Sequence, residues 1–409
     1  MRYPFRTRLD WREWVMPHLL RERPIHRWFV FPHSFTDDIV RALVEEWGLG
    51  KSDQILDPFV GAGTTVLAAM QLGISAIGFD LSPLAVLATQ VKTAKYDADA
   101  LTSDWEKLRR RIKVCKGNGE AKTYARLVQE ALPGSKLATF HWAKATIEDL
   151  DAPSIRKAFF KLALLAQIRK FSNAVPTGGW LSWRANRRPA AALPHELEHS
   201  VKSMLDDLWI TPRPSKGTWR SRIADARGLP VEDASCAAVI TSPPYPNRHD
   251  YTRVFGVELM FGFLDWEETR DLRYQLLHSH PEAKPNRPAA NGYVEPALIT
   301  KAVRDVAKHE ERGRIVDMLQ GYFLDLYLSM KEVSRVLKPG GKAAFVVGNA
   351  QYYGIPIEVD KATALIGKQT GLKCIEIRVV RQRGNSAQQM KIHGRHPSRE
   401  SVVIFSKPE

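Results

Sequence analysis

The chain has 409 residues, with 60 Lys or Arg against 45 Asp or Glu, so its formal net charge at pH 7 is +15. This length favours one catalytic domain with an inserted lobe, and the positive charge indicates a polyanionic partner such as a nucleic acid. The three cysteines lie far apart without metal-ligand spacing, which argues against a zinc site or a disulfide framework. No stretch is apolar and long enough to span a membrane, and the first residues lack a secretory signal, so we expect a cytoplasmic protein.

The first predicted elements form a strand–turn–helix–strand unit. Residues 54–70 predict a buried strand, a glycine-rich turn and a helix. A second short strand follows at 75–80, and the next helix begins at about Pro83, because proline suits the first turn of a helix. The second strand ends in Asp80, at the position where such folds bind the ribose of a nucleotide cofactor.

The glycine-rich turn distinguishes three classes of cofactor. A P-loop needs Gly-Lys-Ser/Thr, whereas Gly63 is followed by two threonines. A dinucleotide site needs a third glycine, and Val66 stands at that position. The remaining class is a nucleoside cofactor without pyrophosphate, S-adenosylmethionine, whose cationic groups suit Asp57 inside the turn. In a pyrophosphate site the same acid would repel its ligand.

The middle segment, residues 101–224, carries most of the positive charge, with 23 Lys or Arg against 11 Asp or Glu, and six of the eleven tryptophans. Basic side chains release counterions from phosphates, and aromatic rings stack on bases. We expect most of these tryptophans to be core and most of the lysines to form a solvated face. The exception is residues 178–189, where Arg and Asn, which suit the reading of base edges, follow two glycines.

An apolar strand at 237–241 ends in the tetrapeptide Ser242-Pro243-Pro244-Tyr245. The prolines cannot donate backbone hydrogen bonds, so they leave their carbonyls free and hold the chain extended. The Ser hydroxyl and the Tyr ring complete a set of acceptors with a stacking face for a flat ring that carries an amine. Surface turns use the same residues, so the tetrapeptide alone leaves both interpretations open. The polar and aromatic residues 246–253 precede a predicted amphipathic helix through Phe255, and we expect them to line the target pocket.

Residues Asp57–Thr65 together with Thr241–Tyr245 resemble the motif pair of the DNA amino-methyltransferases, which methylate N4 of cytosine or N6 of adenine. The resemblance runs from about Arg23 to the C-terminus, except in the middle segment, and Ser242 is more similar to the cytosine branch. It implies an α/β fold: a Rossmann-like class I methyltransferase sheet with an inserted, basic, mostly helical recognition lobe. One departure is Ser235, because the family often has an acid just before this strand.

The resemblance also implies an order of regions. The N-terminal segment and the cofactor-binding half occupy 1–100, the inserted DNA-binding lobe occupies 101–217, and the catalytic half occupies 218–409, with a mobile insertion near 279–312. Three further parts of the sheet are implied: a third strand at 223–226, a fifth strand at 342–349, and an antiparallel hairpin formed by 373–382 and 400–406.

The site residues implied by the resemblance fall into three groups. The cofactor group is His33, Ser34, Phe35, Asp57, Pro58, Phe59, Gly61, Gly63, Thr64, Thr65, Asp80, Leu81, Asp225 and Ala226. Within it, residues 33–35 close over the methionine end and Asp225 meets the adenine amino group. The catalytic group is Ser242, Pro243, Pro244 and Tyr245, with no metal. The DNA-binding group is Trp183, Arg184, Arg187, Arg188, Asn247, Arg248 and Tyr251.

The expected chemistry is direct methyl transfer to a base amine. Ser242 and the Pro243 carbonyl accept hydrogen bonds from the amine, and Tyr245 stacks on a base flipped out of the duplex. A ring-carbon methyltransferase needs a Pro-Cys pair, which the chain lacks. We expect site-specific N4 methylation of cytosine in double-stranded DNA, in a prokaryotic restriction-modification system with a cognate restriction endonuclease. N6-adenine methylation, RNA base-amine methylation and a non-catalytic nucleic-acid-binding subunit remain alternatives.

Overall fold

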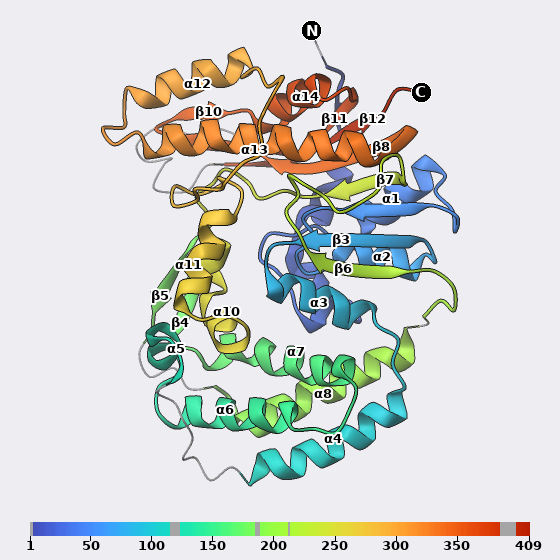
Figure 1. The fold of residues 1–409 in the computed structure, drawn as a ribbon, viewed down its shortest axis with the longest axis vertical. Helices are drawn as coiled ribbons and strands as arrows, with labels where there is room; N and C mark the ends of the chain where they lie inside the picture. Colours follow the sequence, from blue (N-terminus) through green and yellow to red (C-terminus); the bar gives the residue numbers. More distant parts are fainter. Residues whose placement is uncertain (1–2, 115–122, 185–188, 212, 385–397) are drawn as a thin grey trace.

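A central eight-stranded sheet organises the computed structural model, which describes residues 3–114, 123–184, 189–211, 213–384 and 398–409 (Figure 1). Its strand order is β1-β11-β12-β8-β7-β2-β3-β6, and β12 is antiparallel to both of its neighbours while the other pairs are parallel. The sheet strands are β1 Phe5–Thr7, β2 Gln54–Asp57, β3 Ser75–Asp80, β6 Trp219–Ile223, β7 Cys236–Thr241, β8 Leu337–Gly348, β11 Lys373–Arg383 and β12 Ser398–Ser406. Two small hairpins are β4 Ala174–Thr177 with β5 Trp180–Trp183, and β9 Ala350–Tyr352 with β10 Ile355–Ile357. The expected α/β methyltransferase-type sheet is confirmed.

Helices cover the sheet and build a separate lobe (Figure 1). Three short 3₁₀ helices precede the first α-helix: η1 Leu9–Val15, η2 Pro17–Arg21 and η3 His26–Trp28. The α-helices are α1 Asp37–Trp47, α2 Thr64–Gln71, α3 Pro83–Thr93, α4 Ala98–Lys113, α5 Arg126–Ala131, α6 Ser135–Glu148, α7 Ser154–Phe171, α8 Leu193–Ile210, α9 Tyr251–Val254, α10 Gly256–Gly262, α11 Trp266–Gln275, α12 Ala297–Ala307, α13 Arg314–Val336 and α14 Val359–Gln369.

The strand order reverses between β2 and β7. From β2 the chain adds β3 and β6 on one side, and then returns to add β7 and β8 on the other. In such sheets the crevice beyond the carboxyl ends of the two central strands is the usual ligand site. Those ends carry Asp57 and the tetrapeptide that begins at Ser242, so the topology brings together motifs that are far apart in the sequence.

Alternate residues of the central strands bury against different helices. Ile55 and Ile240 pack in a core with residues of α1 and α2, whereas Leu56 and Val239 pack in a core with residues of α13 and α14. Because successive strand side chains point to opposite faces, strands covered on both sides are apolar throughout. This explains why 54–57 and 236–241 lack polar alternation.

The helices α4 to α8 form the lobe at the end of the molecule opposite α12–α14 (Figure 1). Its core is continuous with α3 and with α10: Leu84, Phe159, Leu197 and Phe261 belong to one buried cluster. The expectation that most tryptophans of this segment are core is wrong. Trp105 is buried, but Trp180, Trp183 and Trp209 are 60%, 51% and 68% exposed and Trp142 is also exposed.

Several boundaries differ from those expected. The third strand ends at Ile223, so Asp225 lies beyond it. The helix expected through Phe255 is two helices, α9 and α10, separated at that residue. The insertion near 279–312 is irregular only in part, because it contains α12. β1 was not expected, and it extends the sheet beside β11. Within the described ranges, no helix has the length and apolar character needed to cross a membrane.

Candidate active site

The turn between β2 and α2 is fixed to the end of β3. The Gly61 amide donates to the Asp80 carboxylate at 3.0 Å, and the Ser82 amide donates to the same carboxylate at 2.9 Å. Gly63 has φ +85°, and a Cβ there would lie 2.7 Å from the Thr89 hydroxyl oxygen, so both conformation and space require glycine. Asp80 therefore joins the turn after β2 to the turn after β3, in addition to its expected contact with a ribose.

Asp57 is an almost fully buried acid at the end of β2. Its Oδ1 accepts from the Thr241 hydroxyl at 2.6 Å and from the Phe59 amide at 3.1 Å. Burial raises the pKa of Asp57 to about 6, although these hydrogen bonds act in the opposite direction. Since a cation nearby would favour the charged carboxylate, the site is suited to a positively charged ligand.

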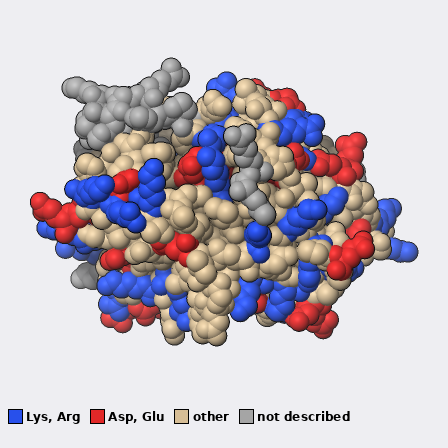
Figure 2. Space-filling view, turned by 90° about the horizontal axis from the view of Figure 1, so that it is seen from above, with Lys and Arg blue, Asp and Glu red and all other residues tan. Residues whose placement is uncertain are grey.

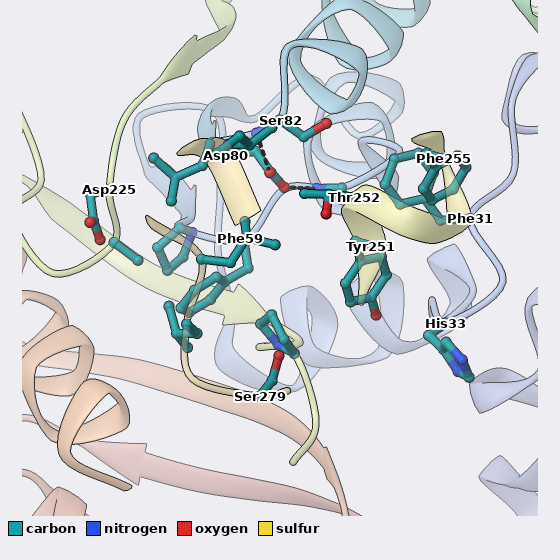
Figure 3. Close-up of a pocket in the computed structure, with 18 of the residues that line it drawn as sticks. Phe31, His33, Phe59, Asp80, Ser82, Asp225, Tyr251, Thr252, Phe255 and Ser279 are labelled. Carbon is teal, nitrogen blue, oxygen red and sulfur yellow. Dashed lines mark hydrogen bonds between the residues drawn. The ribbon is translucent and has the colours of Figure 1, made fainter. Parts of the chain in front are cut away.

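The main cavity lies over the carboxyl ends of these strands, and the empty space in it, counted together with its open mouth, is about 860 Å³. Figure 3 shows Asp225 at one end, His33 toward the other, and Phe59 and Tyr251 between them. Eight residues of the expected cofactor group line it: His33, Pro58, Phe59, Gly61, Asp80, Leu81, Asp225 and Ala226.

A narrower cavity of about 300 Å³ adjoins the main one and shares His33 and Ser242 with it. Its walls include Ser34, Phe35, Asp57 and Thr64, and the Ser34 and Thr64 hydroxyls lie 3.2 Å apart. An elongated site with apolar walls at one end and a buried acid at the other fits S-adenosylmethionine, whose adenosine is flat and whose methionine end is cationic. The residues 33–35 expected at the methionine end do lie beside Asp57. Thr65 is set behind this wall, where its hydroxyl donates to the Ile240 carbonyl at 3.1 Å.

Asp225 reaches the main cavity but is not a free acid. Both of its oxygens accept from the Arg227 guanidinium, at 2.9 and 2.6 Å. Arg227 is buried and also donates to Asp325 of α13, at 2.9 Å. Asp325 in turn accepts from Arg287 at 2.7 Å and from the His278 amide at 2.9 Å. The acid expected at the adenine end therefore belongs to an ionic network that includes the segment around 278–287.

The tetrapeptide is anchored by β8 and β9. The Ser242 hydroxyl donates to the Val346 carbonyl at 3.0 Å, and a Cβ at Gly348 would lie 2.7 Å from the Tyr245 ring. The Tyr352 hydroxyl donates to the Pro246 carbonyl at 2.6 Å. Because the Ser242 proton is directed into the sheet, the oxygen's lone pairs remain as acceptors. Ser242 and Pro244 line the main cavity, and Pro243 is buried between them.

The residues expected to contact DNA fall into different places. Trp183 and Arg184 are exposed at the end of β5, and Asn247 and Arg248 are exposed just after the tetrapeptide. Tyr251 instead forms part of the cavity wall. Arg187 and Arg188 lie outside the described residues. Figure 2 shows the face that carries α12 and α14, where Lys and Arg are interspersed with Asp and Glu rather than gathered into one patch.

Two features of the site were not expected from the sequence. The buried His249 ring lies 4.3 Å from His33 and 4.8 Å from Tyr251, and burial lowers its pKa to about 3, so it is neutral. Asp250, His280 and Glu282 place possible metal-ligand atoms within 4.8 Å of one another. Arg273 lies 2.9 Å from Asp250, and Arg253 and Arg314 lie 3.5 and 3.2 Å from Glu282, so guanidinium groups already neutralise both acids. A hint of a role came from the sequence only for His249 and Asp250, which lie within the run 246–253.

Comparison with known proteins gives consistent matches. A family model described as DNA methylase (N6_N4_Mtase) matches residues 16–90. The Type II methyltransferase M.BsoBI of Geobacillus stearothermophilus is 28% identical, over 95% of this chain and 86% of that protein. The Type II methyltransferase M.AvaI of Nostoc sp. is 27% identical, over 95% of this chain and 87% of that protein.

A solved structure of geranyl diphosphate methyltransferase in complex with SAM matches 99% of this chain and 98% of that chain, with 10% identity and a TM-score of 0.33. The matched segment 16–90 includes Asp57, Gly61, Gly63 and Asp80. The sequence relatives extend over both motifs. The resemblance indicated by the two motifs is confirmed: the chain is related to the S-adenosylmethionine-dependent DNA amino-methyltransferases of the N4/N6 family.

Proposed function

We propose that the protein is a site-specific methyltransferase acting on N4 of cytosine in double-stranded DNA. The observation that carries the proposal is the orientation of Ser242, which lines the cavity and whose hydroxyl donates to the Val346 carbonyl, so that its oxygen keeps acceptor lone pairs. An amine that is to be methylated has protons to donate, so a site for it needs acceptors rather than donors.

The chain's own residues account for binding and orientation. Asp57, Asp80 and Asp225 and the wall from Phe31 to Phe35 hold S-adenosylmethionine, which supplies an electrophilic methyl group when bound. Ser242 and the Pro243 carbonyl accept hydrogen bonds from the two amine protons and turn the nitrogen lone pair toward the cavity. Tyr245, which rests on Gly348, offers its ring to the extruded base. Alignment of this kind supplies much of the acceleration in a displacement reaction.

The relatives support DNA as the substrate, because they are named Type II methyltransferases. From these names we infer that the protein belongs to a restriction-modification system and has a cognate restriction endonuclease as partner. The choice of cytosine N4 rests on Ser242 at the first tetrapeptide position, and N6 of adenine presents the same type of amine.

The test is to incubate the purified protein with S-adenosylmethionine and unmethylated genomic DNA, digest the DNA to nucleosides and analyse them by mass spectrometry. We expect N4-methylcytosine. Detection of N6-methyladenine would show that the target base is adenine and would leave the proposed mechanism unchanged. The absence of any methylated nucleoside would refute the proposal. A parallel incubation with RNA tests the alternative that the substrate is an RNA base.

A further inference from the structure

A groove lies next to the main cavity, on the other side of the segment that follows the tetrapeptide. Tyr251 and Thr252 line the cavity, whereas Arg248 and Arg253 line the groove. Trp180 of the β4–β5 hairpin also lines the groove. The segment 248–253 is therefore a common wall between the proposed base pocket and a surface groove.

The hairpin is seated directly on this wall. A Cβ at Gly179 would lie 2.7 Å from the Arg248 carbonyl oxygen, so backbone touches backbone there. The Arg253 guanidinium lies 4.6 Å from the centre of the Trp180 ring, a cation–π contact. Trp180 is nevertheless 60% exposed, and an accessible aromatic ring can stack on a nucleic-acid base.

The segment 248–253 also fixes the position of Trp180, through Arg253. Arg253 lies 3.4 Å from Asp250 and 3.5 Å from Glu282. Asp250 also caps α9, because its Oδ1 accepts from the Thr252 amide at 2.9 Å. The chain of contacts from Trp180 through Arg253 to Asp250 thus ends five residues from Tyr245.

The groove also contains unusual backbone and unpaired charge. Arg248 and Tyr353 have φ values of +65° and +52°, and they are two of the four non-glycine residues with positive φ in the described part of the chain. Such strain is concentrated at functional sites. Arg248 and Arg312 are exposed, and among the residues that the structure describes neither has a carboxylate within ion-pair distance. Guanidinium groups of this kind suit phosphate oxygens.

We propose that this groove holds the DNA next to the target nucleotide, with Trp180 stacked on a base there and Arg248 and Arg312 on the phosphates. Stacking on Trp180 stabilises the duplex in the state in which the target base is extruded. This proposal rests on the proposed function, and it adds Trp180, outside the active-site cavity, as a residue that positions the substrate.

The test compares two substrates and three variants. The substrates are a duplex that carries a site methylated by the wild type and the same duplex with a mismatch opposite the target base, which lowers the cost of extrusion. The variants are Trp180→Ala, Trp180→Phe and, as a control, Trp209→Ala, which removes a tryptophan that is 68% exposed at the end of α8. Binding of S-adenosylmethionine and the melting temperature are measured for each.

We expect Trp180→Ala to lower kcat/KM on the paired duplex about tenfold or more, and much less on the mismatched duplex. Trp180→Phe should restore most of the activity, and Trp209→Ala should behave as wild type. Full activity of Trp180→Ala on the paired duplex would overturn the proposal, and so would an equal loss on both duplexes. If the wild type methylates no DNA, the proposed function itself fails; an active wild type with an unaffected Trp180→Ala refutes the groove alone.

Discussion

In the proposed active site, the glycine-rich turn of the cofactor side and the tetrapeptide of the target side are held in place by contacts of different range. On the cofactor side, Asp57, Gly61, Asp80 and Ser82 lie within one strand–turn–helix–strand unit, and Asp80 joins its two loops. On the target side, Ser242 is fixed by Val346 and Pro246 by Tyr352, each more than a hundred residues away. A local unit can bind the same cofactor in many settings, whereas the target side depends on how distant segments are brought together.

This difference predicts that the two sides can be impaired separately. Changes on the target side should reduce turnover while S-adenosylmethionine still binds. Changes on the cofactor side should first weaken the binding of S-adenosylmethionine. Variants that weaken cofactor binding and turnover in parallel would show that the two sides are not separate.

The largest effect is expected for Tyr245→Ala. The ring rests on Gly348 and is the proposed stacking face for the base, so its removal should lower kcat about 100-fold or more, the upper range for base–aromatic stacking. The Kd of S-adenosylmethionine, measured by calorimetric titration, should stay within about twofold of wild type. Tyr274→Ala, which removes a partly exposed tyrosine of α11, serves as the control. Full turnover in Tyr245→Ala would exclude the stacking role.

Asp57→Ala should weaken the binding of S-adenosylmethionine about 10- to 100-fold, because it removes a buried charged acceptor facing a cationic ligand. Asp53→Ala is the matched control, since Asp53 lies just before the same strand and its carboxylate accepts from the Gly50 amide at 2.8 Å. Unchanged affinity in Asp57→Ala would remove this residue from the site. Circular dichroism checks that both variants are folded.

The pH dependence of binding gives a further test of the cofactor side. Burial raises the pKa of Asp57 to about 6, so the free protein protonates this group as the pH falls below 6. A cationic ligand prefers the ionised form, and its binding there should release a proton. The Kd should therefore be about tenfold higher at pH 5 than above pH 7, with a flatter profile in Asp57→Asn. An unchanged slope in that variant would assign the titration to another group.

The same difference in range explains what the sequence could and could not predict. The turn around Gly61 and Gly63 is predictable because its glycines, its acid and the flanking apolar strands are local signals. Tryptophan exposure is not predictable in this way: Trp105 and Trp209 lie on similar helices of one lobe, yet one is buried and the other is 68% exposed. The contact between Gly179 and Arg248 and the role of Asp325 depend on tertiary packing, which no spacing in the sequence records.

Two arginines bind the same carboxylate, Asp325, and their variants test the separation of the cofactor side from the target side through the smallest expected effects. Arg227 joins Asp325 to Asp225 at the cofactor cavity, whereas Arg287 joins it to the segment that contains His278 and Ser279. Ser279 accepts from the Arg248 amide at 3.1 Å, so Arg287 acts toward the target side. Arg227→Gln should raise the Kd of S-adenosylmethionine about three- to tenfold, and Arg287→Gln should raise the KM for DNA by a similar factor while leaving that Kd unchanged.

Removing one partner from this buried network also lowers stability, by about 3–5 kcal/mol for the more buried Arg227 and by less for Arg287, which is 22% exposed. Melting temperatures therefore rank the two variants independently of their kinetics. If stability alone were responsible, both constants would change together in Arg227→Gln and neither would in Arg287→Gln. A crossed pattern, in which each arginine affects only its own ligand, requires that Asp325 supports the two sides through separate contacts.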